Sequence, residues 1–149
     1  MIVIQEFEFY PDPEGGYVVK PCGLDGATEG DTYEDAAEMA VDWLRVYALA
    51  ALERGAEFRG GGLGHAPSRG GTVVTLAVSV ELSDVPAVTA AEAAEMLGVS
   101  TARVAQLCRD GSLNSWRVGS TRMVSCDSIE CRLAARPGAG RPHRASAEA

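Results

Sequence analysis

The spacing of hydrophobic residues in the first half of the chain predicts a small sheet and one long helix. Residues 2–9 are rich in β-branched and aromatic side chains, and residues 17–19 are expected to return as a second strand after a turn of proline and glycine. A third short strand is expected near residues 27–29. Apolar residues recur with helical spacing over residues 32–54, and a long strand is predicted over residues 72–82.

The second half predicts shorter elements with clear helix boundaries. Thr89 and Glu92 form a capping-box pattern, so a helix should begin at about Ala90 and end at Gly98. Ser100 can cap a second helix that runs to about Arg109. The two predicted helices are therefore separated by a turn of only three residues, which is the arrangement of a helix-turn-helix.

The region after the second helix predicts a hairpin and a closing helix. Residues 113–124 alternate around a glycine turn, with Trp116 and Val118 expected to face inward and Arg117 outward. A last helix is predicted over residues 127–136. The hairpin would then lie beside the helix-turn-helix as a wing.

One face of the predicted second helix has the chemistry of a DNA-binding surface. Small residues there allow close approach to a groove, while glutamine and arginine can contact base edges or phosphates. Arginines on the predicted wing can contact the phosphate backbone. The candidate DNA-binding residues are Thr101, Arg103, Gln106, Arg109, Arg117 and Arg122.

Charge is distributed unevenly along the chain. The whole chain has a formal net charge of -8. Residues 1–85 carry 15 acidic and 5 basic side chains, whereas residues 86–149 carry 6 acidic and 8 basic ones. The first half therefore suits a basic protein partner, and the second half is the part that could approach nucleic acid.

The stretch Val88-Thr-Ala-Ala-Glu-Ala-Ala-Glu-Met-Leu-Gly-Val-Ser-Thr-Ala-Arg-Val, followed by Arg109-Asp-Gly-Ser-Leu and Arg117-Val-Gly, resembles the winged helix-turn-helix of excisionases and MerR regulators. The resemblance covers about 50 residues. It implies DNA binding. The wing carries fewer basic residues than this family often has, because Met123 and Val124 follow Arg122.

The stretch Tyr10-Pro-Asp-Pro-Glu-Gly-Gly-Tyr-Val-Val, then Pro21 and Leu24-Asp-Gly-Ala-Thr-Glu-Gly-Asp-Thr-Tyr-Glu-Asp-Ala with the long helix after it, resembles the HicB antitoxin family. This resemblance implies a partial ribonuclease-H-like fold that does not cleave RNA. It also implies a partner, a small basic ribonuclease toxin of the HicA kind.

Together these patterns predict an α+β protein of two domains. A HicB-like acidic domain for toxin binding or dimerisation would occupy residues 1–82 and a linker residues 83–88. A winged helix-turn-helix would span residues 89–136, and residues 137–149 are expected to be a disordered tail. Because so few arginines lie in the DNA-binding domain, two or more copies should be needed to hold operator DNA.

The remaining sequence features favour no catalytic chemistry. The four cysteines lack metal-ligand spacing and are expected to be reduced thiols in a cytoplasmic protein. Gly60 to Gly64 lacks a phosphate-loop ending and is expected to be a flexible connection, while His65 and His143 are isolated. No metal, cofactor or membrane segment is expected.

Three functions remain open at this stage. The first is an antitoxin that neutralises a toxin and represses its own operon, which would not be an enzyme. The second is a stand-alone transcription regulator whose first domain senses a ligand or dimerises. The third is a ribonuclease-H-like nuclease with a DNA-targeting module, which would depend on carboxylates such as Asp12 and Asp31.

Overall fold

The computed structural model describes residues 1–135, which divide into two units, Met1–Val85 and a second unit that begins at Pro86. The predictions for Arg136 and for residues 137–149 lie outside the described residues. The elements of the first unit are β1 (Ile2–Pro11), β2 (Tyr17–Pro21), β3 (Thr28–Gly30), α1 (Tyr33–Glu53), β4 (Thr72–Ser79) and the 3-10 helix η1 (Leu82–Asp84). The predicted α+β class is thereby confirmed.

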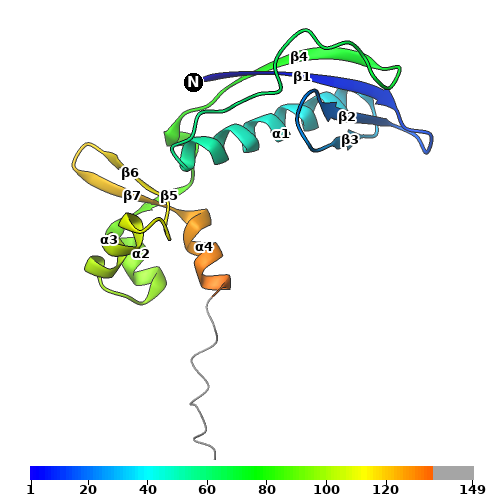
Figure 1. Cartoon of the computed structure of the whole chain (residues 1–149). Helices are drawn as coiled ribbons and strands as arrows, with labels where there is room; N and C mark the ends of the chain where they lie inside the picture. The colour runs from blue at the N-terminus through cyan, green and yellow to red at the C-terminus, as the bar shows by residue number, and fades with distance from the viewer. Residues whose placement is uncertain (136–149) are drawn as a thin grey trace, which may run out of the picture. The chain divides into compact units, whose positions relative to one another are not determined.

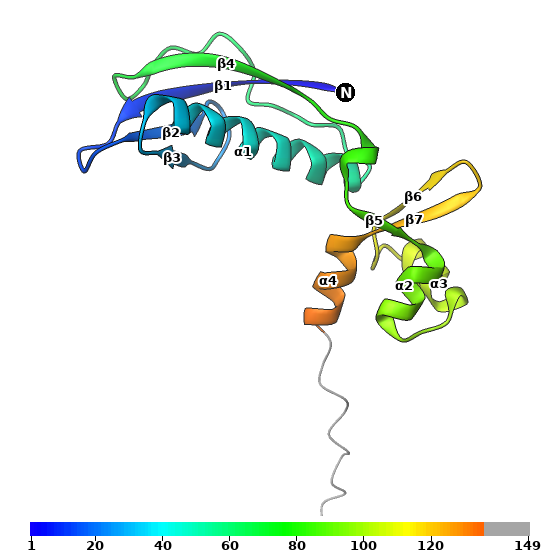
Figure 2. The same cartoon turned by 180° about the vertical axis from the view of Figure 1, so that it is seen from behind.

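The four strands of the first unit form one antiparallel sheet in the order β3-β2-β1-β4, and α1 lies across one face of it (Figures 1 and 2). Alternate residues of β1, including Val3, Phe7 and Phe9, are buried in the core that the sheet forms with α1. The facing side of α1 is mostly alanine, which lets the helix approach the sheet closely. The ribonuclease-H-like fold implied by the family resemblance stays a prediction.

Helix α1 begins and ends where the sequence predicts. The Thr32 hydroxyl accepts a hydrogen bond from the Asp35 backbone N–H at 3.1 Å, which satisfies one of the free donors of the first turn. The helix ends at Glu53, and Gly55 follows with a left-handed backbone at φ 66°. None of the helices within residues 1–135 has both the length and the apolar character needed to span a membrane.

Two carboxylates of β1 organise the glycine-rich segment over residues 60–71. Glu6 accepts hydrogen bonds from the backbone N–H groups of Gly64 and His65, both at 2.9 Å, and its Oε2 lies 2.7 Å from His65 Nδ1. Glu8 accepts from the backbone of Ser68 at 3.0 Å and from Arg69 at 2.7 Å. The segment expected to be a flexible connection is therefore tied to the sheet by its own backbone donors.

These hydrogen bonds favour the ionised form of both carboxylates. The His65 backbone N–H, followed by that of Gly64, lowers the pKa of Glu6 to about 2. Burial raises the pKa of Glu8, but the N–H groups of Ser68 and Arg69 outweigh that effect and lower it overall. Both glutamates remain ionised at neutral pH and act as anchors for the loop.

The second unit is built from β5 (Ala87–Thr89), α2 (Ala90–Leu97), α3 (Thr101–Arg109), β6 (Ser115–Val118), β7 (Thr121–Ser125) and α4 (Cys126–Ala134). Its three strands form an antiparallel sheet in the order β5-β7-β6. Its core is aliphatic and consists of Ala93, Ala94, Leu97, Val104, Leu107, Leu113, Val124 and Ile129.

The segment between the two predicted domains is more ordered than a plain linker. Residues 83–88, which the sequence predicts to be a linker, include the end of η1 and the first two residues of β5. Strand β5 pairs with β7, with Val88 opposite Val124. Three residues are too few to show an alternating pattern, so the strand could not be distinguished from a linker in the sequence.

Candidate nucleic-acid interface

Helix α2 is fixed at both ends by local hydrogen bonds. The Thr89 hydroxyl accepts from the Glu92 N–H at 3.3 Å, and the Glu92 carboxylate accepts from the Thr89 N–H at 2.8 Å. This Thr89 N–H also lowers the pKa of Glu92. At the other end Gly98 has a left-handed backbone, φ 67°, which a residue with a side chain would adopt only with strain. The chain can therefore turn sharply into α3.

Helix α3 is positioned by a cap and by two buried side chains. The Ser100 hydroxyl accepts from the Arg103 N–H at 3.1 Å. Val104 and Leu107 are 0% and 2% exposed and pack into the core with α2. The opposite face of α3 is thereby presented to solvent, as the sequence predicts.

The exposed face of α3 brings together four of the predicted site residues. Thr101, Arg103, Gln106 and Arg109 are all exposed. Arg103 Nη1 donates to Gln106 Oε1 at 2.7 Å, so these two side chains lie side by side on the helix surface. The sequence predicted both residues as contacts but not their interaction. The hydrogen bond to the glutamine restricts the arginine side chain. The arginine's other N–H donors are thereby kept in position for a base edge.

An acidic residue follows α3 directly. Asp110 is exposed, and its carboxylate accepts from the Ser112 backbone N–H at 2.9 Å. Hydrogen bonding to Ser112, and more weakly the charge of Arg103, lowers the pKa of Asp110. A negative charge therefore lies directly after the C-terminal end of α3.

The sheet face predicted for the hairpin side chains is wrong, although Arg117 is exposed as the sequence predicts. Arg117 lies opposite Arg122, and both share the face of the sheet that carries the buried Val124, since residues two apart on a strand point the same way. Trp116 lies opposite Met123 on the other face. Val118, expected to point inward, is 62% exposed.

The two hairpin arginines form a cross-strand pair of like charges, which is unfavourable without an anion between them. Arg117 Nη1 donates to the Ser120 carbonyl at 3.1 Å. Arg122 is half-buried, and among residues 1–135 its Nη1 is a buried donor with no hydrogen-bond acceptor. Both views show the hairpin projecting beyond α2 and α3 (Figures 1 and 2). This pair suits a phosphate group.

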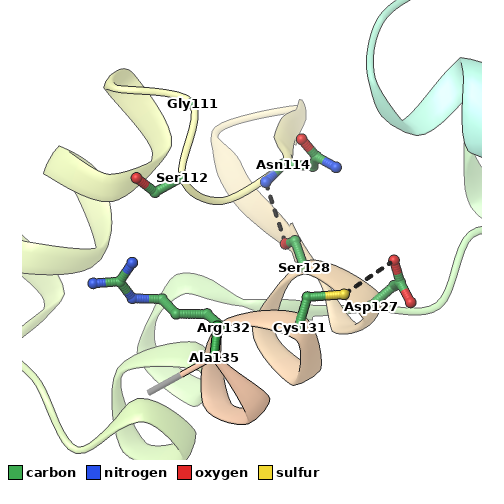
Figure 3. Close-up of a pocket in the computed structure, with 8 residues that line it drawn as sticks. All are labelled: Gly111, Ser112, Asn114, Asp127, Ser128, Cys131, Arg132 and Ala135. Carbon is green, nitrogen blue, oxygen red and sulfur yellow. Dashed lines mark hydrogen bonds between the residues drawn. The ribbon is translucent and has the colours of Figure 1, made fainter. Parts of the chain in front are cut away.

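A cavity of about 440 Å³ lies between α4 and the turn after α3 (Figure 3). The Asn114 N–H donates to Ser128 Oγ at 3.2 Å, and Cys131 Sγ lies 4.0 Å from an Asp127 carboxylate oxygen. The guanidinium of Arg132 points away from that pair. The Asn114–Ser128 hydrogen bond ties α4 to the turn, whereas the Cys131–Asp127 contact lies within α4.

Asp12 and Asp31, on which a nuclease would depend, lie in a turn and at a helix entry of the first unit. Asp12 lies in the turn between β1 and β2, where it accepts from the Glu14 N–H at 2.9 Å, and Asp31 lies just before α1. Within residues 1–135 no three His, Cys, Asp or Glu side chains are grouped so that they could hold a metal ion. His65, isolated in sequence, is paired with Glu6.

Comparison with known proteins identifies the second unit. Residues 87–137 match the family model described as a helix-turn-helix domain. The match covers about a third of the chain and includes α2, α3, the hairpin and α4. Comparison with curated proteins gave no match. The HicB resemblance of the first unit stays a prediction, whereas residues 87–137 are a helix-turn-helix domain, which suggests a DNA-binding regulator.

Proposed function

We propose that this chain is a type II antitoxin that represses its own operon. Its second unit would bind operator DNA, and its first unit would bind and neutralise a small basic ribonuclease toxin of the HicA kind. The protein would act in the cytoplasm, without a cofactor and without enzymatic activity of its own.

The observation that carries the DNA-binding part is the exposed face of α3 beside an uncompensated arginine pair. Arg103 and Gln106 present ordered donors to a groove. Arg117 and Arg122 face each other, and within residues 1–135 neither forms an ion pair with a carboxylate. A phosphate between the two guanidinium groups would relieve their repulsion.

The small number of arginines in the second unit supports DNA binding by two copies of the chain. Few positive side chains of one module can reach phosphates at once, so a single module should bind weakly at physiological salt. A homodimer or a higher assembly would place two α3 helices in successive major-groove half-sites.

DNA binding is tested with the DNA segment upstream of the gene, compared with an unrelated duplex of equal length. Arg103→Ala should weaken binding to the upstream DNA by about 1–3 kcal/mol and reduce the preference over the unrelated duplex. The double variant Arg117→Ala with Arg122→Ala should weaken binding to both duplexes and lower the slope against log salt by about 2.

Arg59→Ala serves as the matched control, because Arg59 is an exposed arginine of the first unit. If it weakens binding as much as Arg103→Ala does, the proposed contact surface is wrong. Wild-type protein that binds the two duplexes equally tightly at physiological salt would contradict operator recognition.

Support for the toxin-binding part comes from the acidity of the first unit and its sequence resemblance to HicB. Co-expression with the protein encoded beside the gene should rescue growth from that protein's toxicity, and the two should purify as a complex. If the neighbouring protein is neither toxic nor retained while DNA binding persists, the chain is a stand-alone regulator.

A further inference from the structure

The outward face of α1 carries a second row of apolar residues, of which Trp43 also packs against the edge of the core under the helix. Met39, Trp43, Val46 and Ala50 follow one another at spacings of four, three and four residues. Met39 is 45% exposed and Val46 is 67% exposed. This spacing is that of the a and d positions of a coiled coil, where one helix receives the side chains of another. The spacing of this row therefore fits the side chains of a second helix.

The row borders a groove of about 540 Å³ whose apolar lining also includes Tyr47. Its aromatic floor is held in place by neighbours. The Trp43 and Tyr47 rings stack at 5.0 Å, and Phe7 meets Trp43 edge-on at 5.7 Å. The Tyr47 ring in turn contacts Phe58. Because these rings are already ordered, little side-chain entropy is lost when a partner binds.

Charges beside the row define what the partner must carry. In the heptad, Asp35 and Asp42 both occupy g positions along one flank, while Arg54 occupies an e position near the C-terminal end. Asp35, Asp42 and Arg54 are exposed, and none of them forms an ion pair with another described residue. A helix with lysine or arginine along the first flank and a carboxylate near Arg54 would match all three charges.

A second copy of the chain does not match this charge pattern. In an antiparallel pair of helices g positions meet g positions, so aspartate would lie near aspartate and Arg54 could not reach it. In a parallel pair Asp42 would face Tyr47 of the other copy. The acidic flank would also be repelled by an anionic membrane surface.

We infer that the outward face of α1 is the docking site for one basic amphipathic helix of a partner protein. This inference rests on the proposed function, in that it names the surface on which the basic partner would bind. Apolar side chains of the partner would fill the groove at heptad spacing, and its basic flank would lie along Asp35 and Asp42.

The test uses two synthetic helical peptides that share leucines at heptad spacing and lack tryptophan and tyrosine. One carries lysine at the flanking positions and the other carries glutamate. Binding is measured without DNA on the full chain with the Trp116→Phe replacement. Trp43 is then the sole tryptophan, and its fluorescence reports on the groove itself.

The lysine peptide should bind at least about tenfold more tightly than the glutamate peptide, because only its flank is attracted to the aspartates. Val46→Glu should abolish binding of both peptides, because it buries an unpaired charge in the row. Asp35→Lys combined with Asp42→Lys should reverse the preference. Leu63→Glu is the matched control, because Leu63 is 63% exposed outside α1, and it should change neither affinity.

Circular dichroism of each variant verifies that α1 is intact. The inference is overturned if the lysine peptide does not bind the full chain, or if Val46→Glu leaves its affinity unchanged. It is also overturned if Val46→Glu instead converts a dimer to a monomer in sedimentation, which would assign the face to a second copy. Because no DNA is present, failure of operator binding would leave the inference standing.

Discussion

Charged side chains serve different purposes in the two units. In the first unit Glu6 and Glu8 are buried, and loop N–H groups bind their carboxylates. In the second unit Arg103 donates to a neighbouring glutamine and Arg117 donates to a turn carbonyl. Part of the negative charge of the first unit therefore maintains the fold, whereas the arginines of the second unit remain available to a ligand. A charge count from sequence does not separate these two uses.

The largest expected effect is on the free energy of unfolding, and it distinguishes the core of the first unit from that of the second. Phe7→Ala should destabilise the first unit by about 3–5 kcal/mol, because Phe7 is fully buried and contacts Trp43 edge-on. Urea denaturation monitored by Trp43 fluorescence in the Trp116→Phe background measures the loss.

Leu107→Ala, in the aliphatic core of the second unit, should cost about 2–5 kcal/mol and leave the Trp43 transition in place. Equal effects of both variants on that transition would show that the units do not unfold separately.

A smaller effect on stability tests whether the Glu8 carboxylate maintains the fold. Glu8→Gln replaces one carboxylate oxygen by an NH2 group, which cannot accept from Ser68 or from Arg69. The expected loss is about 2 kcal/mol, with faster hydrogen exchange at the amides of residues 68–71. Glu57→Gln, at an exposed glutamate of the same unit, should change neither quantity. If the two variants behave alike, Glu8 does not anchor the loop.

The pH dependence of the same loop gives a third prediction. The pKa of Glu6 is about 2 in the folded chain against an ordinary value of 4.5. Its contribution to stability is therefore complete above about pH 4.5 and is lost as the pH falls toward 2. The protection factors of the Gly64 and His65 amides, which compare each exchange rate with that of an unstructured peptide at the same pH, should fall over this range. In Glu6→Gln these protection factors should already be low at neutral pH, with little further change on acidification.

The helix boundaries could be predicted because their causes are local. Thr32, Thr89 and Ser100 cap helices as predicted, and Gly98 turns the chain as predicted. Each of these signals lies within four residues of the backbone group that it satisfies. The exposed contact face of α3 followed from the same reasoning, since the caps fix where the helix begins and the apolar positions fix which side is buried.

The features that the sequence could not predict depend on distant partners. Glu8 and Arg69 are 61 positions apart, and nothing near either residue indicates that one binds the other. The sequence predicted the wrong sheet face for the hairpin side chains, because alternation alone does not show whether the odd-numbered or the even-numbered residues face the core. That choice depends on the pairing of Val124 with Ser115 and Val88. The apolar stripe predicted over residues 32–54 did not include the outward row on α1.

The smallest expected effect compares the same cap in both units. Thr32→Ala and Ser100→Ala each remove a hydroxyl that accepts a backbone N–H at 3.1 Å, so each should cost its own unit about 1 kcal/mol. Helix α1 has 21 residues and α3 has nine, so the loss of one end affects a larger share of α3. Ser100→Ala should therefore also weaken binding to the upstream DNA, because Arg103 donates to this cap, whereas Thr32→Ala should not. If both variants weaken DNA binding equally, the contact face does not depend on the start of α3, and its position is determined by Val104 and Leu107 alone.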